Sequence, residues 1–548
     1  MGSYEEFTET QIKILERFVT NTKGNVFVLR NLPEVIKGAL FSRYSRSSLG
    51  LRSLLLKEFV LGEETAFDAI VGQDGFVEKE DPENQVIAIK KAQNFYDRIL
   101  DGYGDDSIGE LGGAHLAIEN ISMIGAKIIE DSRIGGSPLE KSTRYIYFDQ
   151  KVNGEYLYYR EPILMTSAYK ETYLKICDML FDTYSKLIPK VTEMMEKKFP
   201  KDADSSKAAY VAALRARVLD CLRGLLPAGT LTNMGVYGNG RFWEQLIHRL
   251  HCHPLAELQD VGKGTYDELS KVIPSFVRRA ECHHHHHESY SKFCDALLAE
   301  LQNVTDHQQV VSAETKPGVK LISHDPDGPY KVAGVLLYRF NHYSLETLQN
   351  HCRNLSHEEL AKIFDAASTM REHRRHKSPR ALEHAQFTFE IVADFGIYRD
   401  LHRHRMLTQE RQLLTCDYGF TLPSDLLDTP MEKIYRDAMS RAKEEHAKMA
   451  IELAEEAQYI VPMAYNVRYY FHVNLRALQW LCELRSQAAG HPNYRFVAQE
   501  MARQVIEAVP AFEAFFKFVD YDGHEFGRLG QEERKIAKQT KPEYTETD

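Results

Sequence analysis

Residues 380–418 read RALEHAQFTFEIVADFGIYRDLHRHRMLTQERQLLTCDY. An apolar segment around Phe389 leads here to the basic run His402-Arg403-His404-Arg405. An isolated charge is costly to bury, and an anionic ligand would supply its partner, because the arginine fork matches a phosphate or a carboxylate. A solvated helix end with a basic last turn is the structural alternative, since the helix dipole favours cations there. The stretch therefore predicts either an anion site or an exposed helix terminus.

Length and composition exclude several classes of protein. A chain of 548 residues has room for two or more domains, and its 43% hydrophobic and 27% charged residues are typical of a globular protein. The net charge of −11 argues against a general nucleic-acid or membrane binder. The eight cysteines form no CxxC pair, and the first residues show neither a signal peptide nor an apolar run of membrane length. We expect a cytoplasmic protein with reduced thiols that binds neither nucleic acid nor membranes.

Hydrophobic periodicity and turn signals predict mostly helices with a few strands. The dipeptide Asn153-Gly154 is a strong hairpin signal between strands expected over 144–149 and 155–160, and another short strand is expected over 26–29. Helices are expected over 4–20, 33–43, 51–61, 85–100, 107–129, 165–199, 205–226 and 240–251.

From about residue 330 the pattern of the first half starts again. The matching segments, in order, are 39–44 and 335–340, 114–119 and 385–390, Leu226-Pro227 and Val461-Pro462, Asn239-x-Arg241 and Asn474-x-Arg476, and His253-Pro254 and His491-Pro492. Five matches in the same order indicate a tandem duplication. We expect an N-terminal repeat over 1–280, a linker over 281–329 and a C-terminal repeat over 330–548.

Five consecutive histidines, 283–287, stand in the predicted linker. Such a run could bind a transition metal, but nothing nearby in the sequence supplies the fixed geometry that a dedicated site needs. A flexible loop is therefore the favoured interpretation, and no metal site is expected.

The element Glu383-His384-x-x-Phe-Thr-Phe, followed by Arg403-His404-Arg405, resembles the flavin-dependent thymidylate synthase family. The family motif continues to a Ser and then to Glu-x-Ser-x-Arg, but here Leu413 stands at the first Ser position. The missing element stands in the other repeat, as Glu140-x-Ser142-x-Arg144. The resemblance implies an α+β fold of two tandem repeats, each with a mixed or antiparallel sheet packed with long helices.

The resemblance further implies that the repeats have complementary roles in one composite site. The C-terminal repeat would bind the flavin through Arg403, His404, Arg405, Asn474 and Arg476. The N-terminal repeat would bind the nucleotide through Glu140, Ser142, Arg144 and Arg223. Arg485 would act in catalysis by stabilising negative charge that develops on the base. Asp400 and Gln458 depart from the family, which usually has Gln and a phosphate-binding Arg there.

The leading hypothesis is an FAD-dependent enzyme that converts dUMP to dTMP, with methylenetetrahydrofolate as carbon donor and NADPH as reductant. One alternative is a paralogue that acts on another nucleotide or in another one-carbon reaction, because Asp400 and Gln458 change the local charge. The other alternative is a flavin- or nucleotide-binding scaffold without catalysis. The family forms homotetramers, so two copies of this duplicated chain, a homodimer, would reproduce that assembly.

Overall fold

The computed structural model describes residues 6–44, 47–60, 109–308 and 315–539. The chain divides into two compact units that interleave along the sequence. Unit 1 consists of Met1–Glu119, Ser132–Glu140 and Asn233–Val310. Unit 2 consists of Asn120–Asp131, Lys141–Thr232 and Val311–Asp548. The bounds of the two sequence repeats remain a prediction beside this division.

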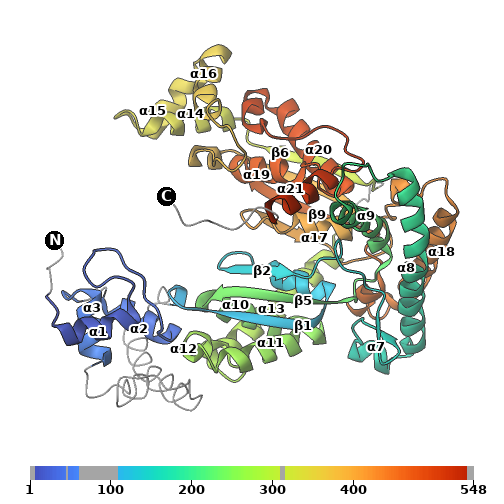
Figure 1. Cartoon of the computed structure of the whole chain (residues 1–548), viewed down its shortest axis with the longest axis horizontal. Helices are drawn as coiled ribbons and strands as arrows, with labels where there is room; N and C mark the ends of the chain where they lie inside the picture. Colours follow the sequence, from blue (N-terminus) through green and yellow to red (C-terminus); the bar gives the residue numbers. More distant parts are fainter. Residues whose placement is uncertain (1–5, 45–46, 61–108, 309–314, 540–548) are drawn as a thin grey trace. The chain divides into compact units, whose positions relative to one another are not determined.

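Most of a three-stranded sheet belongs to unit 1, in the order β1-β5-β2 (Figure 1). Its strands are β1 (Gly113–Ser122), β2 (Gly136–Glu140) and β5 (Leu231–Asn239), and β2 pairs antiparallel with β5. The helices of unit 1 are α1 (Glu9–Phe18), α2 (Glu34–Tyr44), α3 (Leu51–Leu54), the π-helix η1 (Leu55–Val60), α10 (Gly240–His251), α11 (Ala256–Leu269), α12 (Pro274–Val277), the 3-10 helix η4 (Arg278–Ala280) and α13 (His285–Asp306). Helix α10 packs against α11, α12 and α13.

Unit 2 contains a four-stranded antiparallel sheet in the order β6-β7-β9-β8. Its strands are β6 (Gly318–His324), β7 (Gln386–Asp394), β8 (Thr408–Arg411) and β9 (Asn466–Asn474). Along β7 Phe387, Phe389 and Ile391 are buried, and the alternate residues Thr388 and Glu390 are partly exposed. This alternation is the period of a strand with one face in the core, and it explains why the segment around Phe389 forms a central strand.

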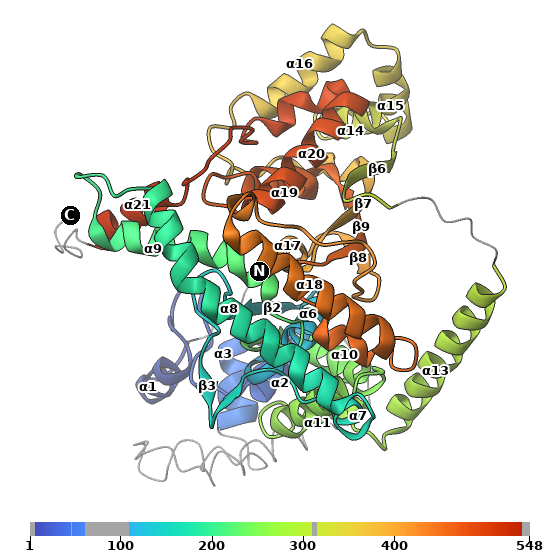
Figure 2. The ribbon, with the colours of Figure 1, turned by 90° about the vertical axis from the view of Figure 1, so that its right-hand side faces the viewer.

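Helices of five to 29 residues complete the described part of unit 2. They are α6 (Met123–Glu130), α7 (Pro162–Thr166), α8 (Lys170–Lys198), α9 (Lys207–Leu222), α14 (Gly328–Tyr338), α15 (Leu345–Arg353), α16 (His357–Ser368), α17 (Phe395–Leu401), α18 (Pro430–Met449), α19 (Leu475–Arg485), α20 (Pro492–Ala508) and α21 (Leu529–Gln539). Short 3-10 helices are η3 (Arg223–Leu225), η5 (Arg380–His384), η6 (Ser424–Leu426), η7 (Glu456–Ile460) and η8 (Pro510–Phe516). Figure 2 shows α8 and α18 side by side. Helices with antiparallel sheets confirm the predicted α+β class.

The two repeats share a strand–cap–helix arrangement. At the end of β5, Asn239 Oδ1 accepts a hydrogen bond from Phe242 N at 2.9 Å, and α10 begins. At the end of β9, Asn474 Oδ1 accepts one from Ala477 N at 2.9 Å, and α19 begins. Asparagine is a preferred N-cap because its side chain satisfies a free backbone N–H of the first turn. The Asn-x-Arg repeat of the sequence therefore corresponds to a shared structural element.

Equivalent residues of the two repeats also face each other inside unit 2. Pro227 and Pro462 form an antiparallel bridge. Beside it, Met463 N donates to Leu226 O at 2.9 Å, and Ala228 N donates to Val461 O at 2.8 Å. Contact between equivalent residues is what a two-fold relation produces. The bridge at Pro227 and Pro462 therefore has the local symmetry of a pseudo-two-fold contact within unit 2.

Several predicted elements differ from the structure. The segment 26–29 forms no strand among the described residues, only a single bridge between Leu29 and Val19. In the segment expected to be a helix over 107–129, the described residues form β1 and then α6, because Ser122 caps a new helix through Gly125 N at 2.9 Å. The predicted helix over 85–100 lies outside the described residues.

The hairpin around Asn153-Gly154 is confirmed, although its strands are shorter than predicted. They are β3 (Lys151–Val152) and β4 (Glu155–Tyr156), and the residues over 144–149 are turn and loop. Asn153 and Gly154 both have positive φ, 53° and 86°, as a type I′ turn requires. In the predicted linker the structure has helix α13 and strand β6.

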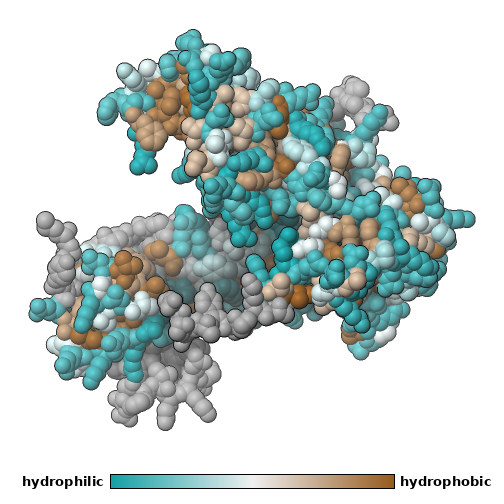
Figure 3. Space-filling view, turned by 45° about the horizontal axis from the view of Figure 1, so that its top comes forward, coloured by the Kyte–Doolittle hydropathy of each residue, from teal (hydrophilic) through white to brown (hydrophobic). Residues whose placement is uncertain are grey.

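Among the described residues, no helix is both long and apolar enough to cross a membrane. The face in Figure 3 is mostly hydrophilic, with apolar residues gathered in several separate places.

Candidate functional site

A cavity of about 650 Å³ in unit 2 is lined by η5, the loop after α17 and helix α19. Six residues named from the sequence line it: Arg403, His404, Arg405, Asn474, Arg476 and Arg485. They come from segments about seventy residues apart, which the β7–β9 pairing and the helices that follow these strands bring together. Its volume is within the range of small-molecule sites, about 300–1,000 Å³.

The lining of this cavity is strongly cationic. Its charged residues are Arg371, Arg374, Arg375, Lys377, Arg403, Arg405, Arg476 and Arg485, with a single carboxylate, Glu383. Arg476 donates to Glu383 Oε1 at 2.8 Å and to Ser378 O at 2.8 Å, so part of this charge is used within the protein. The surplus of positive charge in a concave surface favours an anionic ligand.

An apolar wall lies beside these cations. Trp480 is 39% exposed and Met406 is 70% exposed, and both line the cavity. The guanidinium carbon of Arg374 lies 5.8 Å from the centre of the Trp480 ring. An accessible indole beside a thioether suits a planar aromatic ligand.

Arg485 is held by His404. Arg485 Nε donates to His404 Nε2 at 3.0 Å. His404 is buried, and burial together with the charge of Arg485 lowers its pKa well below the ordinary value, so the imidazole stays neutral and accepts at Nε2. Burial also lowers the pKa of Arg485. The histidine thus fixes the direction of a cation at the cavity wall.

On the side of the N-terminal repeat, Arg144 is paired with a carboxylate. Its Nε and Nη2 donate to the two oxygens of Asp220, each at 2.7 Å, and its Nη1 donates to the Tyr494 hydroxyl at 3.1 Å. Burial opposes ionisation of Asp220, but Arg144 prevails and lowers the pKa of Asp220 to about 2. Ser142 Oγ accepts from Arg144 N at 3.2 Å. Glu140, the last residue of β2, is buried in unit 1.

Arg223 is paired with Asp400, the residue that departs from the family pattern. Its Nη1 donates to Asp400 Oδ2 at 3.1 Å, while its Nη2 is buried with no hydrogen-bond partner among the described residues. Burial disfavours the charged form of Asp400, yet Arg223, Arg144, Arg403 and Arg485 together hold its pKa well below the ordinary value. Asp400 therefore lies within the field of arginines from both repeats.

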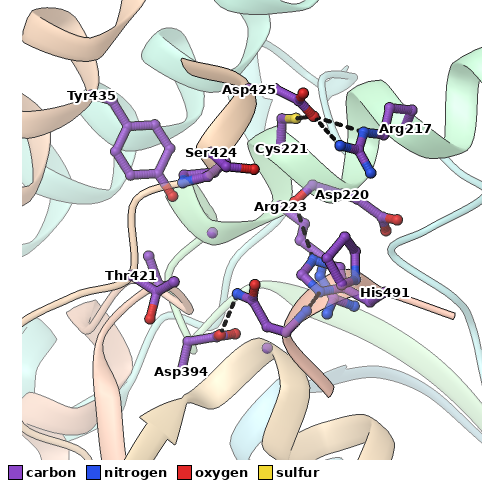
Figure 4. Close-up of a pocket in the computed structure, with 16 residues that line it drawn as sticks. Arg217, Asp220, Cys221, Arg223, Asp394, Thr421, Ser424, Asp425, Tyr435 and His491 are labelled. Carbon is purple, nitrogen blue, oxygen red and sulfur yellow. Dashed lines mark hydrogen bonds and ion pairs between the residues drawn. The ribbon is translucent and has the colours of Figure 1, made fainter. Parts of the chain in front are cut away.

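Arg223 also lines a smaller cavity of about 50 Å³, shown in Figure 4. Its other walls include Asp394 and His491, and Asn493 donates to Asp394 Oδ2 at 3.0 Å. Burial and the charge of Arg223 lower the pKa of His491 to about 3. Such a volume holds a few water molecules, so this cavity by itself is too small for a nucleotide or a flavin.

Tyr494 connects the two sides of the candidate site. The guanidinium carbons of Arg144 and Arg485 lie 5.7 Å and 5.6 Å from the centre of its ring. Sequence reasoning missed Tyr494 and Asp220. The only available signal was the repeated His-Pro pair just before Tyr494, since the tyrosine and Arg144 are 350 residues apart in sequence.

Comparison with known proteins agrees with the duplication. The family described as "thymidylate synthase complementing protein" matches this chain twice, over residues 64–275 and 320–511. A UPF0159 protein of Chlamydia pneumoniae is 57% identical over 537 residues, which cover 98% of this chain and 99% of the relative. A UPF0159 protein of Thermoplasma acidophilum is 33% identical over 528 residues, which cover 92% of this chain and 99% of the relative.

Proposed function

Because the chain belongs to the thymidylate synthase complementing protein family, we propose that it catalyses a flavin-dependent methyl transfer to a pyrimidine nucleotide. The proposed substrate is dUMP and the product dTMP. Methylenetetrahydrofolate would supply the one-carbon group and leave as tetrahydrofolate, and NADPH would supply the hydride that reduces this carbon to a methyl group. The observation that carries the proposal is the convergence of six residues, named beforehand from the family motif, on one cavity.

The residues of this cavity fit FAD. Its basic side chains match a diphosphate, and its apolar wall at Trp480 and Met406 matches a planar ring system. Arg403, Arg405 and Arg476 would bind the charged part of the cofactor. When bound, FAD would accept a hydride from NADPH and pass it on to the one-carbon unit on the base.

Arg485 is the proposed catalytic residue. A cation of fixed direction stabilises negative charge that develops on the pyrimidine as carbon is transferred to it. The hydrogen bond to His404 supplies that direction, and the neutral state of His404 leaves the positive charge on Arg485. His404 is therefore a positioning residue for Arg485.

The nucleotide phosphate would bind near Arg144 and Arg223, within unit 2. Both guanidinium groups are paired with carboxylates in this structure, but Arg223 Nη2 keeps one donor unused. A phosphate there would share the arginines with Asp220 and Asp400, and the repulsion between these anions would weaken its binding.

That repulsion is the specific observation behind a second candidate function. Asp400 already lies within the field of four arginines. A phosphate would need the same arginines, and the negative charge of Asp400 would repel it. A ligand with less negative charge at this end would avoid the conflict. The second candidate is therefore a related one-carbon transfer to a different pyrimidine substrate.

The deciding experiment measures dTMP formation by the purified full-length protein with dUMP, methylenetetrahydrofolate, NADPH and FAD. Omission of each component in turn is the control, and each omission should abolish the product. FAD binding with turnover of another pyrimidine alone would establish the second candidate. FAD binding without turnover of any of them would refute both.

The proposal includes a cytoplasmic homodimer. The pseudo-two-fold bridge at Pro227 and Pro462 supports the idea that one chain replaces two subunits. Light scattering should then give twice the chain mass of 63.0 kDa, whereas a monomer or a tetramer would refute this part.

A further inference from the structure

The loop over 371–378, between α16 and η5, is held in shape by one buried arginine. Arg371 Nε donates to His376 O at 2.6 Å and Arg371 Nη2 donates to Arg374 O at 3.0 Å, so one guanidinium group joins two carbonyls of its own loop. Its Nη1 donates to Glu483 Oε1 of α19 at 2.7 Å, and both side chains are buried. Because desolvation offsets the attraction in such a pair, its main effect here is to fix the backbone of the loop.

The fixed loop presents basic side chains to the cavity of about 650 Å³. Arg374, Arg375 and Lys377 all line this cavity, and none of them forms an ion pair within the part of the chain that the structure describes. The guanidinium carbon of Arg374 lies 5.8 Å from the centre of the Trp480 ring, which places this arginine at the apolar wall. Arg375 and Lys377 are exposed. The loop therefore offers cations whose charge no carboxylate of the described chain neutralises.

Ser378, at the end of the loop, adds a hydroxyl group. It lines the same cavity and is only 4% exposed, and its Oγ has no hydrogen-bond partner among the described residues. A buried hydroxyl without a partner costs free energy, so such a group calls for an explanation. The backbone carbonyl of Ser378 accepts from Arg476 Nε at 2.8 Å, which fixes its position. A ligand that accepts a hydrogen bond at this end of the cavity would supply the missing partner.

The charge of the cavity exceeds what the proposed cofactor needs. The diphosphate of FAD brings two negative charges, and Arg403, Arg405 and Arg476 are the side chains proposed to bind it. The cations of the loop come in addition to these three. The exposure of Arg375 and Lys377 suits a ligand that enters and leaves in every turnover better than a cofactor that stays bound. We therefore look for the second anion on a co-substrate.

We propose that the loop is a phosphate subsite that binds the 2′-phosphate of NADPH through Arg375, Lys377 and Ser378. This inference rests on the proposed function, in which NADPH is the reductant. A phosphate monoester carries about 1.5 to 2 negative charges at neutral pH, and charge-assisted hydrogen bonds from an arginine, a lysine and a hydroxyl match it. Because this phosphate is the only chemical difference between NADPH and NADH, the loop would determine which of the two dinucleotides the protein uses.

The test is calorimetric titration of the full-length protein, incubated with FAD, with adenosine 2′,5′-bisphosphate and with 5′-AMP, which lacks the 2′-phosphate. We expect the bisphosphate to bind about 10- to 100-fold more tightly, the effect of one or two hydrogen bonds to a charged group. The double variant R375Q/K377Q should remove this difference and leave the affinity for 5′-AMP nearly unchanged. The matched control is K433Q/R441Q, which removes the same charge from exposed positions of α18 outside the cavity and should keep the difference.

This titration needs no turnover, so its outcome is independent of dTMP formation. Tight binding of the bisphosphate without dTMP formation would keep the subsite and refute the proposed function. Formation of dTMP by a protein that binds the two probes equally well would overturn the subsite alone. If R375Q/K377Q lost affinity for FAD or for dUMP instead, the loop would bind the phosphates of that ligand, and the assignment to NADPH would be overturned as well.

Discussion

Arg223 Nη1 lies 3.1 Å from Asp400 Oδ2, and this ion pair joins the N-terminal repeat to the C-terminal repeat inside unit 2. The side chain of Arg223 is 4% exposed and that of Asp400 is 17% exposed, so water screens the pair only weakly. Arg144 and Tyr494 form a second link between the repeats, since the hydroxyl accepts from Nη1 at 3.1 Å. The candidate site is therefore built from both halves of one chain.

Asp400→Asn should destabilise the fold and improve phosphate binding. Loss of one partner of a buried ion pair leaves an uncompensated charge, so the free energy of unfolding should fall by about 3 kcal/mol. The same loss removes repulsion toward a phosphate, so the Kd for dUMP should fall by about tenfold. Urea unfolding and isothermal calorimetry measure the two effects.

Asp327→Asn is the matched control for that variant. Asp327 pairs with Arg353 at 2.8 Å on the surface, where such pairs contribute about 0–1 kcal/mol. It should change neither stability nor dUMP affinity appreciably. If Asp400→Asn left dUMP affinity unchanged or weaker, the phosphate would not lie near Asp400.

Arg485→Gln should reduce kcat for dTMP formation by about 100- to 1,000-fold, the cost of one oriented donor at a developing anion. The Kd for FAD, read from visible absorbance, should change little, because other arginines of the cavity supply the cofactor contacts. His404→Asn should give a smaller loss, since it disturbs only the orientation of Arg485. Equal losses of kcat and of FAD affinity in Arg485→Gln would assign this arginine to cofactor binding instead.

His491→Asn should change how stability depends on pH. The pKa of His491 is about 3 in the folded protein, against about 6.5 in the unfolded chain. Between these values the unfolded chain binds more protons, so the contribution of the neutral imidazole is complete above pH 6.5 and is lost as the pH falls toward 3. His491 Nδ1 caps α20 through Asn493 N at 3.2 Å, and asparagine preserves that kind of cap.

The difference in unfolding free energy between the unmodified protein and His491→Asn should thus shrink by about 2 kcal/mol from pH 7.5 to pH 5. Urea unfolding at several pH values measures it. If the unfolding free energies of the two proteins changed in parallel with pH, His491 would titrate normally in the folded protein.

Trp480→Leu should weaken FAD binding by about tenfold, because stacking on an aromatic side chain is worth about 1–3 kcal/mol. Trp480→Phe keeps a ring and should stay within about threefold of the unmodified protein. The chain has only two tryptophans, and Trp243 is fully buried in unit 1. Quenching of tryptophan fluorescence by FAD should accordingly be weaker in Trp480→Phe than in the unmodified protein, and undiminished quenching would place the flavin elsewhere.

Local patterns in the sequence predicted the parts of the fold that local physics controls. Asn153-Gly154 specified its turn through backbone conformation, and the Asn-x-Arg repeats marked two N-capped helices. The segment that forms β1 was expected to be helical because it is mostly apolar. Its apolar residues and glycines do not show the clear two-residue alternation that would have indicated a strand. Its strand state depends on the neighbouring β5, which lies more than a hundred residues away in sequence.

The candidate site shows the same limit. Residues of the basic run and of α19, each part of a recognisable motif, line one cavity in the structure, and their roles in binding stay a prediction. Asp220 and Tyr494 were missed because each acquires its partners only through tertiary packing. The flexible-loop interpretation of the histidine run was wrong for that reason: helix α13 begins within the run, and His287 gains a fixed neighbour in His248 of α10, 39 residues earlier.

The most direct test of a composite site is the visible absorbance spectrum of the protein with FAD, before and after addition of dUMP. We predict a bound-flavin spectrum that dUMP perturbs. Arg403→Ala should weaken FAD uptake, whereas Arg223→Ala should retain FAD and lose the dUMP-induced change. A protein that takes up no FAD, or whose flavin spectrum does not respond to dUMP, would contradict the account.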